Sequence, residues 1–378
     1  MKKNMIKLGD VATYINGYAF KPEDRGEVGL PIIRIQDLTG NAYDLGFYNG
    51  DYPKRIEIND GDVLISWSAS LGVYVWNRGR ALLNQHIFKV EFDKVNIDKS
   101  YFVYAVRQKL AEMAMKTHGA TMKHIVKKDF EETLIPYPSQ KKQIEIGTNL
   151  DKIANIIAAR KQQLELLDEL VKARFVEMFG DCNNLISMED VCSIITDGTH
   201  QPPKFKESGI PFILVSNLSN NTITYNTEKY ISEETYSALY KRTPIEIGDL
   251  LLSTVGSYGH PAVVTEDTRF LFQRHIAYLK PKREIVNSFY LHSALLAPDG
   301  QRQIEEKIKG IAQKTLNLSE IRKIMIPVPE IEEQNEFADF VKRIDKSKVN
   351  YYYKKRKDGF PPLLLIYSVT TIINLSDY

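Results

Sequence analysis

Short apolar runs bounded by Gly, Pro, Asn or Asp recur along the chain, a pattern typical of the strands of a small sheet. In the first half these runs begin at Ile32 and Val63 and recur at 87–90. A helical pattern then covers 101–116, and a last run ends at Pro136. The second half repeats this order, with runs at Phe212, Leu250, 276–279 and Ile326 and a helical pattern over 288–309. Each half therefore predicts an α/β domain of the α+β kind, with a mixed or antiparallel sheet.

The two halves also match residue by residue in three places. Leu30–Leu38 aligns with Ile210–Leu218, and Gly61-Asp62-Val63-Leu64-Ile65-Ser66 aligns with Gly248-Asp249-Leu250-Leu251-Leu252-Ser253. Ile135-Pro136-Tyr137-Pro138 with Gln143 aligns with Ile326-Pro327-Val328-Pro329 with Gln334. Three matches in the same order, separated by small insertions, indicate a tandem duplication. The function should therefore involve one kind of task at two places.

A long helix is predicted between the two copies. From Gln140 to Phe179 there is no proline, and no glycine after Gly147. Apolar residues recur every seven positions on two lines, as in a coiled-coil seam. Such a helix would be roughly 60 Å long, enough to hold two domains apart. Six residues of the two lines are our candidates for binding a partner helix or subunit: Leu150, Ile153, Ile157, Leu164, Leu167 and Val171.

A second helix begins after the second copy but is predicted to be shorter. Its helical pattern starts at Ile331 and includes Phe337, and Gly359 with Pro361 prevents its continuation. The predicted organisation is a domain at 1–139, a long spacer helix at 140–180, a second domain at 181–330, a truncated distal helix at 331–350 and an atypical tail at 351–378. If the first helix lacks a full partner, its exposed apolar seam predicts self-association or dependence on another subunit.

Composition and charge exclude several classes of protein. Fifty Lys and Arg residues against 48 Asp and Glu give a net charge of +2, so any basic surface must be local. Two cysteines, Cys182 and Cys192, are too few for a disulfide framework or a zinc site. The start of the chain has no apolar run of signal-peptide length, and 363–375 is too short for a convincing membrane span. We therefore expect a cytoplasmic protein with no membrane contact.

The sequence contains no strong catalytic motif: it has no phosphate-binding glycine loop, dinucleotide fingerprint or His/Cys metal cluster. Gln201-Pro202-Pro203-Lys204 is a weak match to an amino-methyltransferase motif, and a rigid loop explains it better. Asp299, Glu305 and Lys307 imitate a nuclease site, but their spacing favours a solvated helix face. We expect no catalytic residues, metal or cofactor on this chain.

Basic residues are concentrated in both copies just before the last strand. Residues 107–128 and 302–323 each contain six Lys or Arg, which suits phosphate contacts, although an ordinary charged helix surface is the competing interpretation. Nearby loops carry amide, hydroxyl, His and Arg side chains that could read base edges, although each alone could equally serve a turn or a core. The candidate DNA-binding residues are Lys21, Arg34, Gln36, Ser66, Ser68, Gln85, His86, Lys123, His124, Thr196, Asp197, His200, Ser216, Asn217, Ser257, Tyr258, Arg274, His275 and Lys314.

These features together resemble the specificity (S) subunits of type I restriction-modification systems. The resemblance rests on the tandem copies, the Ile-Pro-x-Pro…Gln signatures, the Gly-Asp-apolar-Ser strands, the Asp197-Gly198-Thr199-His200 loop and the long helix, and it covers residues 5 to 348. Two departures are Lys142, where the family usually has Glu before the Gln, and the short distal helix.

The resemblance implies a non-catalytic subunit whose two target recognition domains each read half of a split double-stranded DNA site. The paired helices would set the spacing and dock methyltransferase (M) subunits that bring S-adenosylmethionine and flip the target adenine. A restriction translocase (R) subunit, using Mg and ATP, would join for cleavage. This chain itself would bind none of these cofactors.

Two other functions are compatible with the sequence. The first is a coiled-coil scaffold with two peptide- or protein-binding α/β domains. The second is an autonomous methyltransferase or nuclease, which would require activity from the isolated chain. Salt-sensitive binding to one bipartite DNA sequence would distinguish the specificity subunit from the scaffold.

Overall fold

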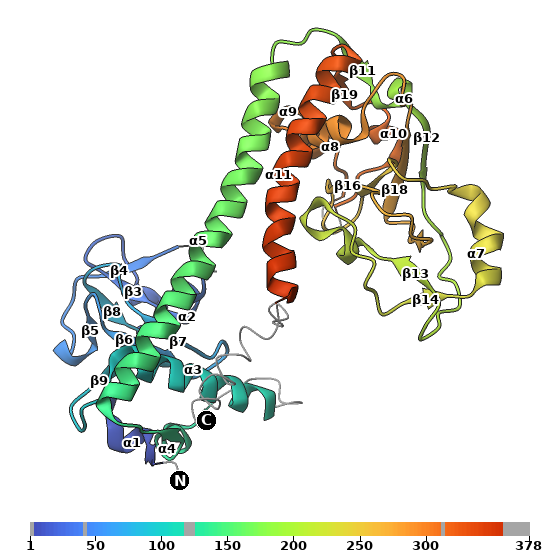
Figure 1. Cartoon of the computed structure of the whole chain (residues 1–378). Coiled ribbons are helices and arrows are strands. Elements are labelled where there is room, and N and C mark those ends of the chain that lie inside the picture. Colours follow the sequence, from blue (N-terminus) through green and yellow to red (C-terminus); the bar gives the residue numbers. More distant parts are fainter. Residues whose placement is uncertain (1–3, 41–43, 117–124, 311–313, 358–378) are drawn as a thin grey trace. The chain divides into compact units, whose positions relative to one another are not determined.

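The computed structural model describes residues 4–40, 44–116, 125–310 and 314–357 (Figure 1). The chain divides into two compact units, an N-terminal unit that ends at Arg160 and a C-terminal unit, Lys161–Lys355. The boundary lies inside helix α5 (Gln140–Phe179), which begins in one unit and ends in the other. The predicted long helix between the copies is therefore present.

The N-terminal unit is built from short strands joined by loops and a few helices. Its helices are α1 (Leu8–Val11), α2 (Ile35–Thr39), α3 (Lys99–Lys116), α4 (Lys127–Glu131) and the first part of α5, with 3-10 turns η1 (Pro22–Asp24) and η2 (Lys54–Ile56). Its strands are β1 (Met5–Lys7), β2 (Thr13–Asn16), β3 (Leu30–Ile33), β4 (Gly46–Tyr48), β5 (Glu57–Ile58), β6 (Val63–Ser66), β7 (Gly72–Val75), β8 (Ala81–Leu83), β9 (Ile87–Glu91) and β10 (Leu134–Pro136).

The core of this unit surrounds an antiparallel sheet of order β2-β9-β6-β7, beside a second sheet of order β4-β3-β8-β5 in which β3 and β8 are parallel. All four residues of β6 are buried. Val63 and Ile65 pack in a cluster with Phe102 of α3, whereas Leu64 packs in a cluster with residues of the second sheet. Because both faces of β6 are covered, the strand is a continuous apolar run rather than an alternating one.

The C-terminal unit contains most of the same elements in the same order, with additions and, among its described residues, without a counterpart of β5. Its strands are β11 (Leu185–Ser187), β12 (Cys192–Asp197), β13 (Ile210–Ile213), β14 (Tyr230–Ile231), β15 (Leu250–Ser253), β16 (Pro261–Val263), β17 (Leu271–Phe272), β18 (Ile276–Pro281) and β19 (Met325–Pro327). Its helices are the end of α5, α6 (Met188–Val191), α7 (Glu233–Leu239), α8 (Ser288–Leu296), α9 (Pro298–Glu306), α10 (Leu318–Ile321) and α11 (Ile331–Lys357), with 3-10 turns η3 (Val215–Asn221) and η4 (Tyr240–Arg242).

The sheets of the C-terminal unit repeat those of the N-terminal unit. Order β12-β18-β15-β16 corresponds to β2-β9-β6-β7, and β14-β13-β17 corresponds to β4-β3-β8. The small ladder of β1 with β10 has its counterpart in β11 with β19. This agreement confirms the predicted tandem duplication and the mixed sheet.

The Gly-Asp signature marks the same tight turn in both units. Gly61 and Gly248 have φ values of +90° and +91°, a region that favours glycine. The Asp62 carboxylate accepts a hydrogen bond of 2.8 Å from the backbone N–H of Asn59, and Asp249 accepts one of 2.9 Å from Glu246. The match between these segments therefore reflects backbone geometry.

The helical pattern predicted at 288–309 forms two helices instead of one. Helix α8 ends at Leu296, Ala297 is extended, and α9 begins at Pro298. Proline disfavours a helical conformation in the residue before it and is well suited to the first turn of a new helix. The sequence-based prediction of one continuous helix was therefore wrong.

Helix α11 extends beyond its predicted end at 350, to Lys357. Residues 351–357 contain no glycine or proline, so nothing stops the helix before Gly359. In the C-terminal unit the end of α5 and the start of α11 lie side by side (Figure 1), and the rings of Phe175 and Phe337 meet edge to face with centroids 5.4 Å apart. None of the described helices is long and apolar enough to cross a membrane.

Candidate nucleic-acid interface

Four loops of the C-terminal unit meet at one end of its main sheet, and we call them the second loop edge. They comprise residues 198–204, 254–260, 273–275 and 314–317. The N–H of Thr199 donates to the carbonyl of Phe272 at 2.9 Å, and the N–H of Arg274 donates back to Thr199 at 3.1 Å. The N–H of Thr254 donates to His275, and that of Leu316 donates to Thr254. Backbone hydrogen bonds thus hold the four loops together.

The N-terminal unit has the same arrangement, which we call the first loop edge, formed by residues 17–21, 67–71, 84–86 and 125. The N–H of Tyr18 donates to Leu83 at 2.8 Å, and the N–H of Gln85 donates to Tyr18 at 2.9 Å. The N–H of Trp67 donates to His86, and that of Ile125 donates to Trp67. The two edges are therefore equivalent in backbone.

A glycine begins the first loop of each edge because the chain passes very close to its neighbour there. A Cβ atom on Gly17 would lie 2.0 Å from the carbonyl oxygen of Asn84. A Cβ atom on Gly198 would lie 2.3 Å from that of Phe272. No side chain fits at these distances, so both crossings require glycine.

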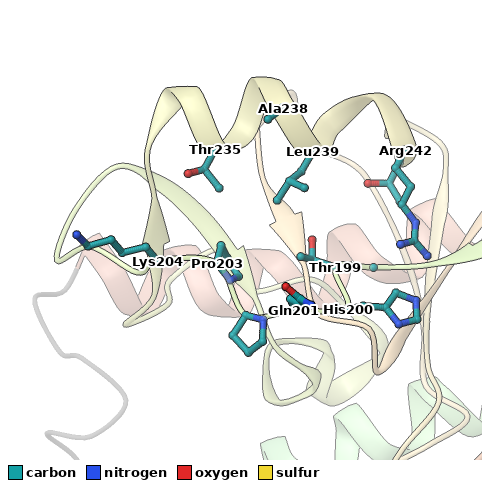
Figure 2. A pocket seen from close by; sticks show the side chains of 12 residues that line it. Thr199, His200, Gln201, Pro203, Lys204, Thr235, Ala238, Leu239 and Arg242 are labelled. Carbon is teal, nitrogen blue, oxygen red and sulfur yellow. The ribbon is translucent and has the colours of Figure 1, made fainter.

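A pocket of about 500 Å³ opens beside the second loop edge. Figure 2 shows its walls, with Thr199 to Lys204 on one side and Thr235 to Arg242, from α7 and η4, on the other. The Asp197 carboxylate at its margin forms an ion pair with Arg242 at 2.5 Å and lies 2.9 Å from His200 Nε2. The N-terminal unit has no counterpart of α7 among its described residues, so this pocket distinguishes the second copy.

Lys314 and Tyr258 meet on the second loop edge. The Lys314 ammonium lies 3.3 Å from the Tyr258 hydroxyl and 3.3 Å from the Glu305 carboxylate. These hydrogen bonds raise the pKa of Lys314 above its usual value. Lys314 therefore stays charged at physiological pH while its partners partly neutralise it.

On the first loop edge, His86 has a φ of +70° and packs edge-on against Trp67, with ring centroids 4.9 Å apart. Lys21 and Gln85 are exposed. Ser66 is fully buried, and its hydroxyl donates a hydrogen bond of 2.5 Å to the carbonyl of Ser70. The structure thus places candidates of two kinds here, some open to a ligand and others used by the loop itself.

Several predicted base-contacting residues have structural partners instead. Ser66, Ser68 and Asn217 are buried, so their side chains are not available to DNA in this conformation. Asn217 accepts a hydrogen bond from the N–H of Leu214 at 3.0 Å and donates to Thr224, which closes the turn after β13. A short polar side chain suits either a turn or a base edge, and burial decides between them.

Arg34 makes an ion pair with the buried Asp37 at 3.1 Å and donates a hydrogen bond to the carbonyl of Asp44. Gln36 and Ser216 are exposed at equivalent turns. The preceding strands end at Ile33 and Ile213, whose carbonyls accept hydrogen bonds from Asn84 and Gln273, so these turns adjoin the loop edges.

The remaining candidates are distributed as follows. Thr196 and Asp197 are half-buried at the end of β12. Ser257 and Arg274 are exposed, and His275 is half-buried. Lys123 and His124 lie outside the described residues. The second loop edge therefore gathers His200, Ser257, Tyr258, Arg274, His275 and Lys314, and the first gathers Lys21, Gln85 and His86.

Comparison with known proteins agrees with the duplication. The family model of the type I restriction modification DNA specificity domain matches residues 2–167 and 184–355. The chain belongs to this family. Each matched segment contains one unit's strands and the helix, or part of the helix, that follows them, so the family repeat includes the helix.

Two relatives and two solved structures illustrate the similarity. The specificity subunit of the type I restriction enzyme EcoBI from Escherichia coli is 27% identical, over 90% of this chain and 78% of the relative. The MjaVIII specificity subunit from Methanocaldococcus jannaschii is 23% identical, over 96% and 91%. The S subunit structure from M. genitalium matches with a TM-score of 0.54 at 14% identity, over 99% of this chain and 95% of that one. A structure from a study of type I R-M complex assembly matches with a TM-score of 0.51 at 15% identity, over 98% and 96%.

In this family member, the two weak catalytic matches lie in a pocket wall and among surface ion pairs. Gln201 to Lys204 form a pocket wall. Asp299 is paired with Arg302 on its own helix at 2.5 Å, and Glu305 is bonded to Tyr258 and Lys314. The described residues contain no cluster of three or more His, Cys, Asp or Glu that could hold a metal. These carboxylates form surface ion pairs, as the solvated-helix interpretation predicts.

Helix α5 has apolar residues on two faces, which sequence analysis missed. Val171 packs against the cluster that contains Phe175 and Phe179, and Leu150 is buried. Leu166 and Leu170 are 60% and 47% exposed. Among the other predicted seam residues, Ile157 is exposed, and Ile153, Leu164 and Leu167 are half-buried. The exposed face could have been found from the spacing of Leu166 and Leu170, which are four residues apart.

Proposed function

We propose that this chain recognises double-stranded DNA at two half-sites, with one loop edge reading each half. The observation that carries this proposal is that the two edges share their backbone hydrogen bonds but differ in their side chains. Gln85 stands where the second edge has Arg274, and Trp67 stands where it has Thr254. One scaffold that presents different polar groups is what two readers of different sequences require.

The names of the relatives support this assignment. Both belong to type I restriction enzymes, and both are specificity subunits. By analogy, the present chain supplies recognition and no catalysis. Methyltransferase subunits would provide S-adenosylmethionine, and a translocase subunit would provide Mg- and ATP-dependent cleavage. The ion pairs of Asp299 and Glu305 agree with a non-catalytic role.

The exposed face of α5 is the proposed docking surface for a methyltransferase subunit. Leu166 and Leu170 lie one helical turn apart and are largely open, although the opposite face of the same helix is packed. Exposed apolar groups on a helix that is already anchored are typical of a protein interface. The competing occupant of this face is a second copy of this chain.

The proposal is tested by producing the full chain with its methyltransferase subunit and mapping methylated adenines across a genome. We expect one bipartite motif with two defined halves separated by a spacer of fixed length. Binding of the complex to a duplex containing that motif should weaken steeply as salt rises, because phosphate contacts release counterions. Methylation without a shared motif, or DNA binding that is insensitive to salt and sequence, would contradict the proposal and favour a protein-binding scaffold.

A further inference from the structure

Gln85 and Arg274 occupy the same position in the two loop edges. The N–H of Gln85 donates to the carbonyl of Tyr18, and the N–H of Arg274 donates to that of Thr199. Tyr18 and Thr199 each follow the glycine at which the chain crosses its neighbour. A histidine comes next in both copies, followed by the buried Ile87 or Ile276 that begins β9 or β18. The backbone is hydrogen-bonded before this position and buried after it in both units. The side chains of Gln85 and Arg274 therefore start from equivalent places in the two loop edges.

Both side chains are exposed and lack strong partners. Among the described residues, Arg274 forms no ion pair with a carboxylate, and its Nε lies 3.3 Å from His275 Nε2. Arg242 and Lys314, which are also beside the second edge, are both paired with carboxylates. The Gln85 side chain makes no hydrogen bond to the described residues, whereas its backbone N–H donates to Tyr18 and to the Asn84 side chain. The donors and acceptors of this one position are thus available to a ligand.

The chemistry of the two side chains points to different bases. A guanidinium presents two parallel N–H donors, which match the O6 and N7 acceptors of guanine in the major groove. A carboxamide presents one donor and one acceptor, which match N7 and N6 of adenine. We infer that Gln85 and Arg274 are specificity-determining residues, and that Gln85 reads an adenine in one half-site and Arg274 a guanine in the other. This inference rests on the proposed function and adds the residue and the base in each half.

The inference predicts that a single substitution changes a single base pair. In the full chain with its methyltransferase subunit, Arg274→Gln should remove the preference for one G·C pair in one half of the motif and leave the other half intact. Gln85→Arg should act in the same way on one A·T pair in the opposite half. On duplexes that differ at that pair alone, discrimination should fall by on the order of ten- to a hundredfold.

Matched variants separate base reading from charge and folding. Lys346→Gln removes one exposed positive charge from α11 of the same unit, away from the loop edge, and should leave the motif unchanged. Arg274→Lys keeps the charge but loses the two-pronged donor, so it should also lose the guanine preference. Each variant should unfold at the same temperature as the unsubstituted protein, because the side chains of Gln85 and Arg274 and that of the control residue are all exposed.

Three results would overturn the inference. An Arg274→Gln variant with an unchanged motif would do so, as would a uniform loss of affinity for every sequence, which is the behaviour of a phosphate contact. A change in both half-sites would also count against it. Failure of the proposed function gives a different result, because the unsubstituted complex would then show no bipartite motif at all.

Discussion

The side-chain oxygen of Gln143 accepts a hydrogen bond of 2.9 Å from the backbone N–H of Asp98, at the start of α3. Its amide nitrogen donates to the carbonyl of Pro138 at 2.8 Å. Gln334 repeats both contacts, with Asn287 and Pro329, and donates also to Ile285. The Pro-x-Pro…Gln signature therefore joins the start of each long helix to the domain that precedes it. The strongest motif in the chain is architectural.

Substitution of either glutamine should destabilise its unit. Gln143 and Gln334 are 1% and 0% exposed, so Gln→Leu leaves a buried N–H and a buried carbonyl without partners. We expect each substitution to lower the free energy of unfolding by about 1–3 kcal/mol. Urea denaturation measures this change, and Gln162→Leu, at an exposed site on α5, is the control. Equal stability of Gln143→Leu and the control would show that the contact contributes little.

Much of the fold follows from the sequence because backbone requirements leave clear signals. Glycine at Gly61 and Gly248, prolines at the last strand and the heptads of α5 each predict local structure that the protein contains. The break at Pro298 was missed because the apolar pattern continues across it, and helix α7 has no counterpart from which it could be inferred.

The candidate site was less predictable. Asn217 and Arg274 are both polar residues in loops of the second copy, but one side chain is buried in its own turn and the other is exposed. Which polar side chains pair with each other depends on contacts between segments far apart in sequence. The pairing of Arg242 with Asp197 is an example. Composition alone cannot show that Arg274 remains without a carboxylate while nearby cations are neutralised.

Acid should remove a specific contribution to the stability of the N-terminal unit. Hydrogen bonds from Arg80 and Tyr52 lower the pKa of Glu57 from 4.5 to about 2. Because the folded value lies below the unfolded one, the ionised carboxylate stabilises the fold above about pH 4.5, and this contribution is lost as pH falls towards 2.

The test compares the unsubstituted protein with Glu57→Gln by urea denaturation at several pH values. The difference in unfolding free energy should be largest near neutral pH and should shrink below about pH 4.5. Arg80→Gln removes the cationic partner and should flatten the same pH dependence. A difference that stays constant across this range would mean that the ion pair does not link stability to pH.

Loss of the Asp197 carboxylate should strengthen non-specific DNA binding. Asp197 neutralises Arg242 and contacts His200 beside the second loop edge, so Asp197→Asn leaves an added positive charge there. We expect tighter binding to unrelated duplexes at low salt and a steeper salt dependence, measured by fluorescence anisotropy on the complex. Glu246→Gln is the control, because it removes a carboxylate paired with Lys280 at the opposite end of β18. Equal effects of the two substitutions would indicate that only net charge matters.

The two faces of α5 should respond differently to a charge. Leu166→Glu with Leu170→Glu places carboxylates on the exposed face, so unfolding temperature should be unchanged while affinity for the methyltransferase subunit falls by on the order of tenfold or more. Val171→Glu places one against the cluster of Phe175 and Phe179, and this variant should instead unfold at a lower temperature.

Val28→Glu alters an exposed apolar residue of the N-terminal unit and controls for a general change in surface charge. Calorimetry of partner binding and thermal unfolding together separate the cases. A double variant that binds its methyltransferase normally but no longer self-associates would assign the exposed face to a second copy of this chain. Unchanged behaviour in both assays would leave Leu166 and Leu170 as ordinary surface residues, because an interface that excludes water cannot accommodate two unpaired carboxylates at its centre without a measurable loss of affinity.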